Sequence, residues 1–336
     1  MNKYQYLVAG IATVLALAGS ATNSLAQRKP NTQFTPYSSV SFGAGSSHYY
    51  GDLAGYKRPI RATFILPRWN VGLGYTRQFT PNFAARASFT WARIVGDDYT
   101  FYKDRIDKYL VQYARNLHFR NDLKEFAVTG IYNFIPDGRN PERRAKFTPY
   151  VFGGIALVAH SPEARTPAVP NNEPYEAQQW VKLQPLHTEG QGQPGRDKPY
   201  SLVTASIPIG LGARYRINDM FNVGFEIGFR YTFTDYLDDV GSSYANPTSL
   251  EGLARVMGDR RFEQNAARYK NNPPNRYQEL TDRFSNGSPE LQAAIQDALT
   301  TQPARGADGV FNDGYMLTNI SIQYIIPTKI KCPPIR

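Results

Sequence analysis

One stretch, from Phe221 to Phe233, constrains the fold of this chain more than any other. Large apolar residues occupy every second position in it, and polar residues or glycine lie between them. Such alternation predicts a β-strand with one apolar and one polar face. At about 3.3 Å per residue and a tilt of about 45°, the stretch spans roughly 28 Å along a membrane normal, close to the apolar band of a transmembrane β-barrel. A strand of a soluble sandwich carries the same pattern, so the remaining chain must decide.

Seven further segments alternate in a similar way, some less regularly. They cover residues 37–47, 69–78, 83–95, 123–135, 147–159, 201–217 and 315–326. Their connections are alternately short (residues 79–82, 136–146 and 218–220) and long (residues 48–68, 96–122, 160–200 and 236–314). Short periplasmic turns and long extracellular loops are typical of outer-membrane barrels, whereas a soluble sandwich gives no reason for this asymmetry. The sequence therefore predicts an all-β fold, an eight-stranded antiparallel transmembrane β-barrel with long extracellular loops.

The N-terminal segment predicts export. Lys3 precedes an apolar run over residues 6–18, and Ser24-Leu25-Ala26 is a small-x-small cleavage site. We therefore expect a signal peptide over residues 1–26 and a barrel domain over residues 27–336. Beyond residue 26 no apolar run has the roughly 18 residues of a spanning helix. A barrel in the outer membrane, with both mature termini in the periplasm, is the expected location.

Composition narrows the classes of function. The net charge of +10 is spread without a dense basic run, which favours outer-membrane lipids or an acidic partner over nucleic acid. The single Cys332 excludes an intramolecular disulfide and a cysteine-based zinc site. The four histidines lie in three loops without paired metal spacing, so we predict no cofactor and no metal.

Charged residues on the polar faces of the strands are candidate lumen residues. They are Arg86, Glu125, Arg214, Glu226 and Arg230. The interior of an eight-stranded barrel is only wide enough for side chains to fill, so we predict ion pairs that plug the lumen in place of a conducting pore. The polar-face glycines are then small lumen residues: Gly72, Gly74, Gly210 and Gly212.

The long loops offer weaker signals. Residues 250–270 and 289–299 read as helices separated by a breaker over residues 271–275, and residues 160–200 read as irregular or mobile. Two acidic pairs, Asp97-Asp98 and Asp238-Asp239, follow strands on the long-loop side. Such pairs can hold Ca²⁺ or act as acid and base, but we expect the commoner case of solvated loop acids.

Short motifs resemble a known family. They are Tyr49-Tyr-Gly-Asp-Leu53, Arg58-Pro59, Tyr75 to Pro81, Arg86 to Arg93, Gly96-Asp-Asp-Tyr99, Arg115 to Asn121 and Asn312-Asp-Gly-Tyr315. Together they resemble the PorG-like family, outer-membrane β-barrels of Bacteroidota. The loop residues that carry the likeness are Tyr50, Gly51, Asp52, Gly96, Asp97, Asp98, Arg115 and Asn116. The resemblance implies a structural or assembly role in type IX protein secretion and contact with the periplasmic ring lipoproteins of that system.

Other functions stay open. A lipid-modifying enzyme or a ligand-binding barrel would use the long loops, and a soluble periplasmic β-protein is a third alternative. An enzyme of this kind needs a histidine, a nucleophile and an orienting acid. His160, Ser161 and Glu163 offer these residue types, but no spacing rule selects them. We therefore expect no enzymatic activity.

Overall fold

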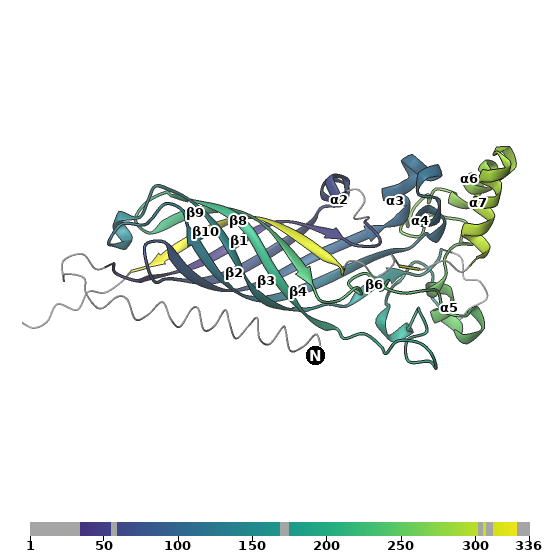
Figure 1. The fold of residues 1–336 in the computed structure, drawn as a ribbon, viewed down its shortest axis with the longest axis horizontal. Helices are drawn as coiled ribbons and strands as arrows, with labels where there is room; N and C mark the ends of the chain where they lie inside the picture. Colours follow the sequence, from purple (N-terminus) through teal and green to yellow (C-terminus); the bar gives the residue numbers. More distant parts are fainter. Residues whose placement is uncertain (1–33, 55–58, 169–174, 302–304, 307–311, 328–336) are drawn as a thin grey trace, which may run out of the picture.

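The computed structural model describes residues 34–54, 59–168, 175–301, 305–306 and 312–327. A long barrel forms one end of the molecule, and helices and short strands gather at the other end (Figure 1). The predicted signal peptide, Arg58 and the region around Cys332 lie outside the described residues.

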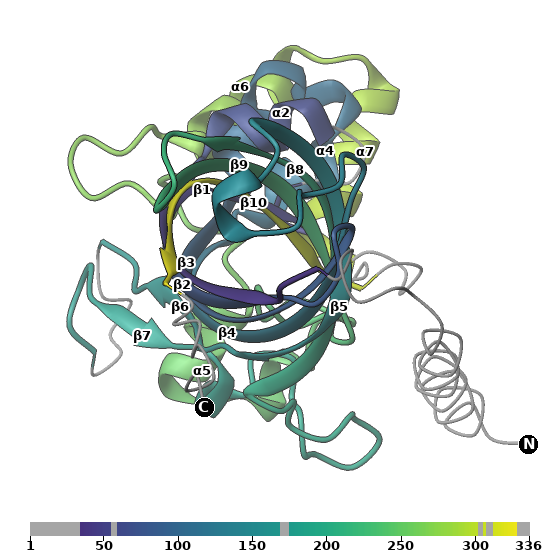
Figure 2. The ribbon, with the colours of Figure 1, turned by 90° about the vertical axis from the view of Figure 1, so that its left-hand side faces the viewer.

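Eight antiparallel strands form the barrel. They are β1 (Tyr37–Tyr50), β2 (Arg68–Gln78), β3 (Phe83–Asp97), β4 (His118–Asn133), β5 (Phe147–Ala159), β8 (Val203–Arg216), β9 (Phe221–Thr232) and β10 (Gly314–Ile326). Their order is β3-β2-β1-β10-β9-β8-β5-β4, and the pairing of β3 with β4 closes the ring. Figure 2, viewed from the short-turn end, shows this ring. The predicted eight-stranded antiparallel barrel is confirmed, although β4 begins at His118 and not at residue 123.

The outward face of the barrel is apolar on every strand. In β9, Phe225, Ile227 and Phe229 are 40–45% exposed, whereas Gly228 and Arg230 are buried in the lumen. The other strands expose the same kind of side chain: Val40, Phe42, Leu73, Phe89, Phe126, Val128, Ile155, Leu157, Ile209, Leu211, Ile320 and Ile322. An exposed apolar surface of this extent is far larger than the patches of a soluble monomer.

Strand β5 carries apolar residues on both faces, and the structure assigns each face. Val151, Ile155 and Leu157 point outward, while Tyr150 and Phe152 are buried in the lumen. A Cβ atom on Gly212 would collide with the ring of Tyr150, and one on Gly210 would collide with Phe152. These glycines are therefore required because two aromatic rings share the lumen with them.

The four long connections fold together at one end of the barrel. They hold α2 (Pro59–Ile65), α3 (Asp98–Tyr102), η2 (Lys103–Lys108), α4 (Leu110–Arg115), β6 (Pro162–Arg165), β7 (Trp180–Lys182), η4 (Gln184–Leu186), η5 (Pro247–Ser249), α5 (Gly252–Gly258), α6 (Arg276–Asn286) and α7 (Pro289–Thr300). We call this assembly the cap (Figure 1). The short connections at the opposite end contain only the single turn η3 (Pro141–Arg143) among the elements described.

An apolar cluster joins the barrel to the cap. Buried residues from β1, β3, β4 and β10 meet buried residues of α3, α4, α6 and α7 there. Its fully buried members include Tyr49, Leu53, Ile94, Phe101, Ile106, Tyr113, Phe119, Leu123, Leu237 and Tyr315. The cap is thus packed onto the barrel end and does not consist of separate loops. No helix in the described part of the chain is both long and apolar enough to cross a bilayer.

Two predictions about the long loops need correction. The described part of residues 160–200 is largely irregular as predicted, but it contains the hairpin β6–β7, because Glu163 pairs with Arg120 near the start of β4 and extends the sheet. The helix expected over residues 250–270 is only α5, which ends at Gly258. Asp259 there accepts hydrogen bonds from the backbone and the guanidinium of Arg261, which holds the following chain in a non-helical path.

The last two helices have clear local caps. The expected helix over residues 289–299 is confirmed as α7, with the Ser288 side chain accepting from Leu291 N. Helix α6 was not predicted. It begins directly after the proline-rich breaker because Asn275 caps it, accepting from Gln278 N.

Candidate functional site

The centre of the lumen holds two ion pairs from opposite walls of the barrel. Arg86 on β3 pairs with Glu226 on β9, and the Tyr150 hydroxyl donates to the same carboxylate at 2.5 Å. Arg230 Nε lies 3.3 Å from Glu125 Oε2, which also accepts from the Tyr315 hydroxyl at 2.5 Å. Strands β3 and β9, like β4 and β10, face each other across the ring. These side chains therefore cross-link the barrel through its interior.

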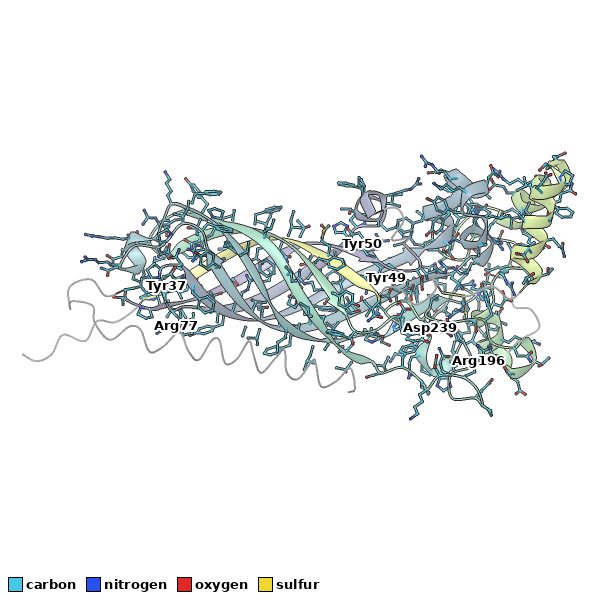
Figure 3. All side chains as sticks on the ribbon, viewed as in Figure 1. Tyr37, Tyr49, Tyr50, Arg77, Arg196 and Asp239 are labelled. Atoms are coloured by element: carbon cyan, nitrogen blue, oxygen red, sulfur yellow. The ribbon has the colours of Figure 1, made fainter. Side chains whose placement is uncertain are left out.

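The fifth predicted lumen charge, Arg214, lies nearer the short-turn end. Its Nη2 is 2.9 Å from Asp137 Oδ2, and the Tyr37 hydroxyl donates to the same oxygen at 2.7 Å. Arg144 lies beside them and donates to the backbone oxygens of Asn218 and Asp219, both at 3.0 Å. Figure 3 places Tyr37 at this end of the barrel. Turn and strand residues together close the lumen there.

The structure thus brings the five predicted lumen charges into two sets, and it adds partners that sequence reasoning missed. Tyr150 lies on a strand whose two faces both look apolar, and Asp137 lies in a turn outside the alternating pattern. Each of the five predicted charges has an opposite charge as a partner, which is the condition for keeping charges away from water. Within the described residues, these side chains reach across the lumen with their charges paired.

The residues of the family-like motifs meet in the cap. Asp98 and Arg115 form a bidentate pair, with Nε–Oδ2 at 2.9 Å and Nη2–Oδ1 at 2.7 Å. Arg115 also donates to the backbone oxygens of Arg305 at 2.6 Å and Asp52 at 2.8 Å. One guanidinium therefore ties together three long connections, those of β1–β2, β3–β4 and β9–β10. We call these four residues the clasp.

Two neighbours of the clasp complete it. Asp97 caps α3 by accepting from Thr100 N at 3.1 Å. Asn116 has a left-handed backbone with φ of 57°, and its amide donates to Asn265 O at 3.0 Å and accepts from Ala267 N at 3.1 Å. Burial raises the pKa of Asp98, and the Arg115 guanidinium opposes that rise.

The other motif residues serve packing. A Cβ atom on Gly51 would collide with Tyr49, and one on Gly96 would press on Phe119 at 2.6 Å. The Tyr50 hydroxyl meets Thr63 of α2 at 2.5 Å, which fixes that helix beside the barrel. The motif residues are therefore one structural unit.

A second cluster pairs two carboxyl groups at the barrel end. The Tyr49 hydroxyl lies 2.7 Å from Asp238 Oδ2 and 2.7 Å from Asp313 Oδ1. Backbone amides reach the other oxygens, Val240 N at 2.9 Å and Leu237 N at 2.8 Å. Burial raises the pKa of both aspartates; repulsion from Asp313 adds to the rise for Asp238, and repulsion from Asp235 and Asp52 adds to the rise for Asp313. Since one phenol proton can serve only one carboxylate, the second contact requires a carboxyl proton.

Arg305 organises a third cluster. It contacts Glu189 Oε1 at 3.1 Å, Asp239 Oδ2 at 3.4 Å and Asp239 O at 2.6 Å. The Tyr200 hydroxyl donates to Asp239 Oδ1 at 2.6 Å, and the Thr188 hydroxyl to Oδ2 at 2.5 Å. Burial raises the pKa of Asp239 to about 6. Figure 3 shows Tyr49 and Asp239 at the junction of barrel and cap.

These contacts overturn the expectation of solvated acids. Asp97, Asp98, Asp238 and Asp239 are all at most 1% exposed. They are buried because the loops need acceptors for arginine, tyrosine and backbone donors inside the cap. In the portion of the chain that the structure describes, no group of three or more His, Cys, Asp or Glu residues has the geometry of a metal site.

The candidate enzymatic residues do not converge. His160 is buried and its ring stacks on Tyr200, with centroids 6.2 Å apart. Glu163 points outward and pairs with Arg120 at 2.7 Å. Ser161 N donates to the Asn121 side chain at 2.8 Å. No hydrogen bond joins His160, Ser161 and Glu163 side chains within the described ranges. Burial also lowers the pKa of His160 to about 4.

Comparison with known proteins adds a partial family match. Residues 31–166 match a family described as "Domain of unknown function (DUF6089)", which covers β1 to the β6 strand and most of the clasp. A search of curated proteins finds no match.

Solved structures with similar topology are outer-membrane proteins. Ail of Yersinia pestis, in complex with the heparin analogue sucrose octasulfate, is 10% identical, with 87% of this chain and 100% of that chain covered and a TM-score of 0.34. A major outer membrane protein from Thermus thermophilus is 11% identical, with coverages of 87% and 100% and a TM-score of 0.37. OprG from Pseudomonas aeruginosa is 9% identical, with coverages of 89% and 100% and a TM-score of 0.35. At these TM-scores the likenesses carry no inference about function, and the barrel architecture follows from the strand pairings.

Proposed function

We propose that this protein is an outer-membrane β-barrel with a closed lumen that serves as a structural or assembly component and not as a pore. One observation carries the proposal: the two faces of the barrel wall have opposite character. The outward face is apolar on all eight strands, and the inward face carries paired charges. This arrangement is expected of a barrel wall that contacts hydrocarbon on its outside and polar groups on its inside.

Aromatic side chains support placement in a bilayer. Exposed rings gather near the short-turn end, where Phe83, Tyr132, Phe147 and Tyr215 are 46–53% exposed, and near the cap end, where Trp69 and Trp91 are 38% and 42% exposed. Two aromatic girdles at the membrane–water interfaces are typical of such barrels. With the cap outside the cell, the ends of β1 and β10 that pair at Ser38 and Ile326 lie on the periplasmic side.

The cap supports a role in binding or assembly. Its loops are tied by the clasp and by the Arg305 cluster, so it presents a defined surface outside the membrane. A barrel that only sat in the membrane would not need an ordered cap of this kind. We propose type IX protein secretion as the finer role, with contact to its periplasmic ring lipoproteins. The support is the resemblance to the PorG-like family, to which three of the four clasp residues belong. Exposed basic residues at the short-turn end, Arg139, Arg143 and Lys146, suit an acidic periplasmic partner.

Heat-modifiable migration after membrane fractionation tests the coarse proposal. A folded barrel in the outer-membrane fraction is expected to migrate faster before boiling than after it. Recovery of the chain in the soluble periplasmic fraction would contradict the proposal. In planar bilayers, the purified protein is expected to give no steady conductance, and stable channel currents would contradict the closed lumen.

Deletion of the gene, followed by an assay of type IX cargo export, tests the finer role. Loss of export that the wild-type gene restores is expected. Normal export in the deletion strain would refute the secretion role and leave the barrel assignment intact.

A further inference from the structure

Arginines gather on the outward surface of the barrel, directly beyond its tryptophan pair at the cap end. The rings of Trp69 and Trp91 lie 5.1 Å apart in an edge-on contact, and the Arg93 guanidinium lies 5.6 Å from the Trp69 ring. Tryptophan prefers the membrane–water interface. Arg93 follows Trp91 by two residues on β3, which places it about 5 Å farther from the bilayer centre for a strand tilted about 45°. It therefore lies at the level of lipid headgroups.

Four further arginines lie near this surface at the cap end of the molecule. They are Arg68 at the start of β2, Arg120 on β4, Arg165 on β6, and Arg268 in the chain after α5. We call these four and Arg93 the rim arginines. Arg68 lies within electrostatic range of Arg93 and Arg268, and Arg165 lies within range of Arg120 and Arg268. Arg68 and Arg165 therefore each have two other rim arginines nearby, and Arg268 is near both of them.

The nearby carboxylates neutralise only part of this series. Arg93 pairs with Asp122 at 2.5 Å and Arg120 pairs with Glu163 at 2.7 Å. Arg268 approaches Asp97 only at 4.0 Å, and that buried carboxylate is already bound by Thr100. Among the described residues, neither Arg68 nor Arg165 has a carboxylate within ion-pair distance. Two exposed lysines, Lys124 and Lys182, add to the positive surface.

Arg165 is held in place without an anionic partner. Its backbone N–H donates to His118 Nε2 at 3.0 Å, and its carbonyl accepts from Arg260 at 2.7 Å. The Trp180 ring lies under both Arg120, at 3.9 Å, and Arg165, at 5.0 Å. A ring face attracts two cations that repel each other. The side-chain Nε of Arg165 has no hydrogen-bond partner in the described structure.

We propose that the rim arginines bind the phosphorylated headgroup of a lipid in the leaflet around the cap end of the barrel. Guanidinium forks match phosphate oxygens in geometry and charge. Directly below the arginines, Trp91 and Phe126 expose the apolar wall against which acyl chains would pack. A ligand with phosphate above and hydrocarbon below fits both surfaces, whereas a free anion uses only one. This inference rests on the proposed position of the barrel in an outer membrane.

The test uses the full mature chain, purified in a neutral detergent, with lipid A as the probe. Native mass spectrometry measures binding of lipid A that carries two phosphates and of the same lipid after removal of both phosphates. The wild-type chain is expected to bind the phosphorylated lipid at least about tenfold more tightly. The double variant Arg68→Glu/Arg165→Glu is expected to lose about tenfold in affinity for the phosphorylated lipid only. The matched control, Arg105→Glu/Lys198→Glu, reverses two exposed charges elsewhere on the cap and is expected to bind like the wild type.

Three outcomes would overturn the inference: equal binding of the two lipids, unchanged binding by the rim variant, or complete displacement of the lipid by millimolar inorganic phosphate. The last would identify a site for free phosphate.

Heat-modifiable migration of each variant checks folding. If the double variant does not fold, Arg165→Gln and Arg165→Lys carry the test, with affinity expected in the order wild type, lysine, glutamine. A heat-modifiable barrel without lipid selectivity contradicts this inference alone, whereas a chain without heat-modifiable migration contradicts the proposed function.

Discussion

The lumen and the cap both bury arginine, but they use it for different purposes. In the lumen, Arg86, Arg214 and Arg230 meet carboxylates. In the cap, buried arginines also donate to backbone carbonyls, in several cases beside a carboxylate partner. Arg276 alone reaches four of them: Tyr113 O at 3.4 Å, Ala114 O at 3.2 Å, Arg261 O at 2.5 Å and Glu263 O at 2.9 Å.

The difference has a physical origin. Backbone groups of a barrel strand are paired mainly with those of the neighbouring strands, so the charged lumen side chains are satisfied mainly by one another. Buried loops lack such ladders, and their carbonyls need donors from side chains. The guanidinium group, with five N–H donors in a rigid fork, can satisfy several carbonyls at once. In the cap, arginine side chains therefore supply hydrogen bonds that strand pairing supplies in the barrel.

The largest expected effect comes from Arg276→Leu. The substitution leaves four buried carbonyls without their donor, and we expect the cap to lose about 4 kcal/mol of stability. Limited proteolysis should cleave the cap rapidly while the barrel keeps its heat-modifiable migration. Arg283→Leu on the same helix is the control, because Arg283 is partly exposed and its ion pairs contribute little. Equal protease resistance of the wild type and Arg276→Leu would contradict the conclusion that arginine stabilises the cap through backbone carbonyls.

The corresponding change in the lumen is Glu226→Ala. It leaves Arg86 buried without its carboxylate, and we expect the barrel to lose about 3 kcal/mol. The urea concentration at which the heat-modifiable form disappears measures this loss, and the cap should keep its protease resistance. The double variant Arg86→Met/Glu226→Leu should recover most of the stability, since it removes both charges. If the double variant is as unstable as the single one, charge burial is not the cause.

A smaller effect is expected from Asp98→Asn. The amide cannot form the bidentate charged pair with Arg115, so the clasp should weaken by about 2 kcal/mol. Hydrogen exchange of residues 110–117 should become faster while exchange in the barrel strands stays the same. Asp122→Asn is the control, because Asp122 and Arg93 are about one third exposed and their pair contributes less than about 1 kcal/mol. Faster exchange throughout the barrel would show that cap and barrel unfold together.

The smallest effect concerns pH and Asp313. The folded-state pKa of Asp313 lies above its value in the unfolded chain, so the folded cap holds a proton that the unfolded chain releases. Cap stability should therefore fall as pH rises from the ordinary aspartate pKa through the raised one. Asp313→Asn mimics the protonated acid and should make the cap about 1 kcal/mol more stable than wild type at pH 8, with little difference at pH 4. A wild-type proteolysis rate that does not change with pH would contradict the shared proton.

The barrel could be predicted because its signal is local. From Phe221 to Phe233, the polarity of each residue indicates whether its side chain faces outward or into the lumen. The neighbouring strands repeat this pattern. Even so, the two faces of β5 could be assigned only from the structure, because Tyr150 and Phe152 look as apolar in the sequence as Val151 and Ile155. Their place in the lumen follows from Gly210 and Gly212 on the adjacent strand, which leave room for the rings.

The cap could not be predicted to the same degree because its contacts join distant residues. Residues 160–200 read as irregular, yet Glu163 extends the sheet through Arg120. The acids Asp98 and Asp239 read as solvated, yet Arg115 and Arg305 bury them. These partners are far apart in the sequence, so a pattern of consecutive residues cannot reveal them. Residues 259–270 are not helical although a helix was expected there, because Arg260 and Arg261 hydrogen-bond to backbone carbonyls elsewhere in the cap.

The sequence by itself determined the number of strands, their direction, the apolar outer wall and the five charges inside it, because strand alternation and loop length are properties of consecutive residues. Only the tertiary structure decided how the charges pair, that the loops form a clasped cap, and that the rim arginines share one surface. Those features depend on residues such as Arg115 and Arg305, which the closure of the barrel brings together from connections far apart in the chain.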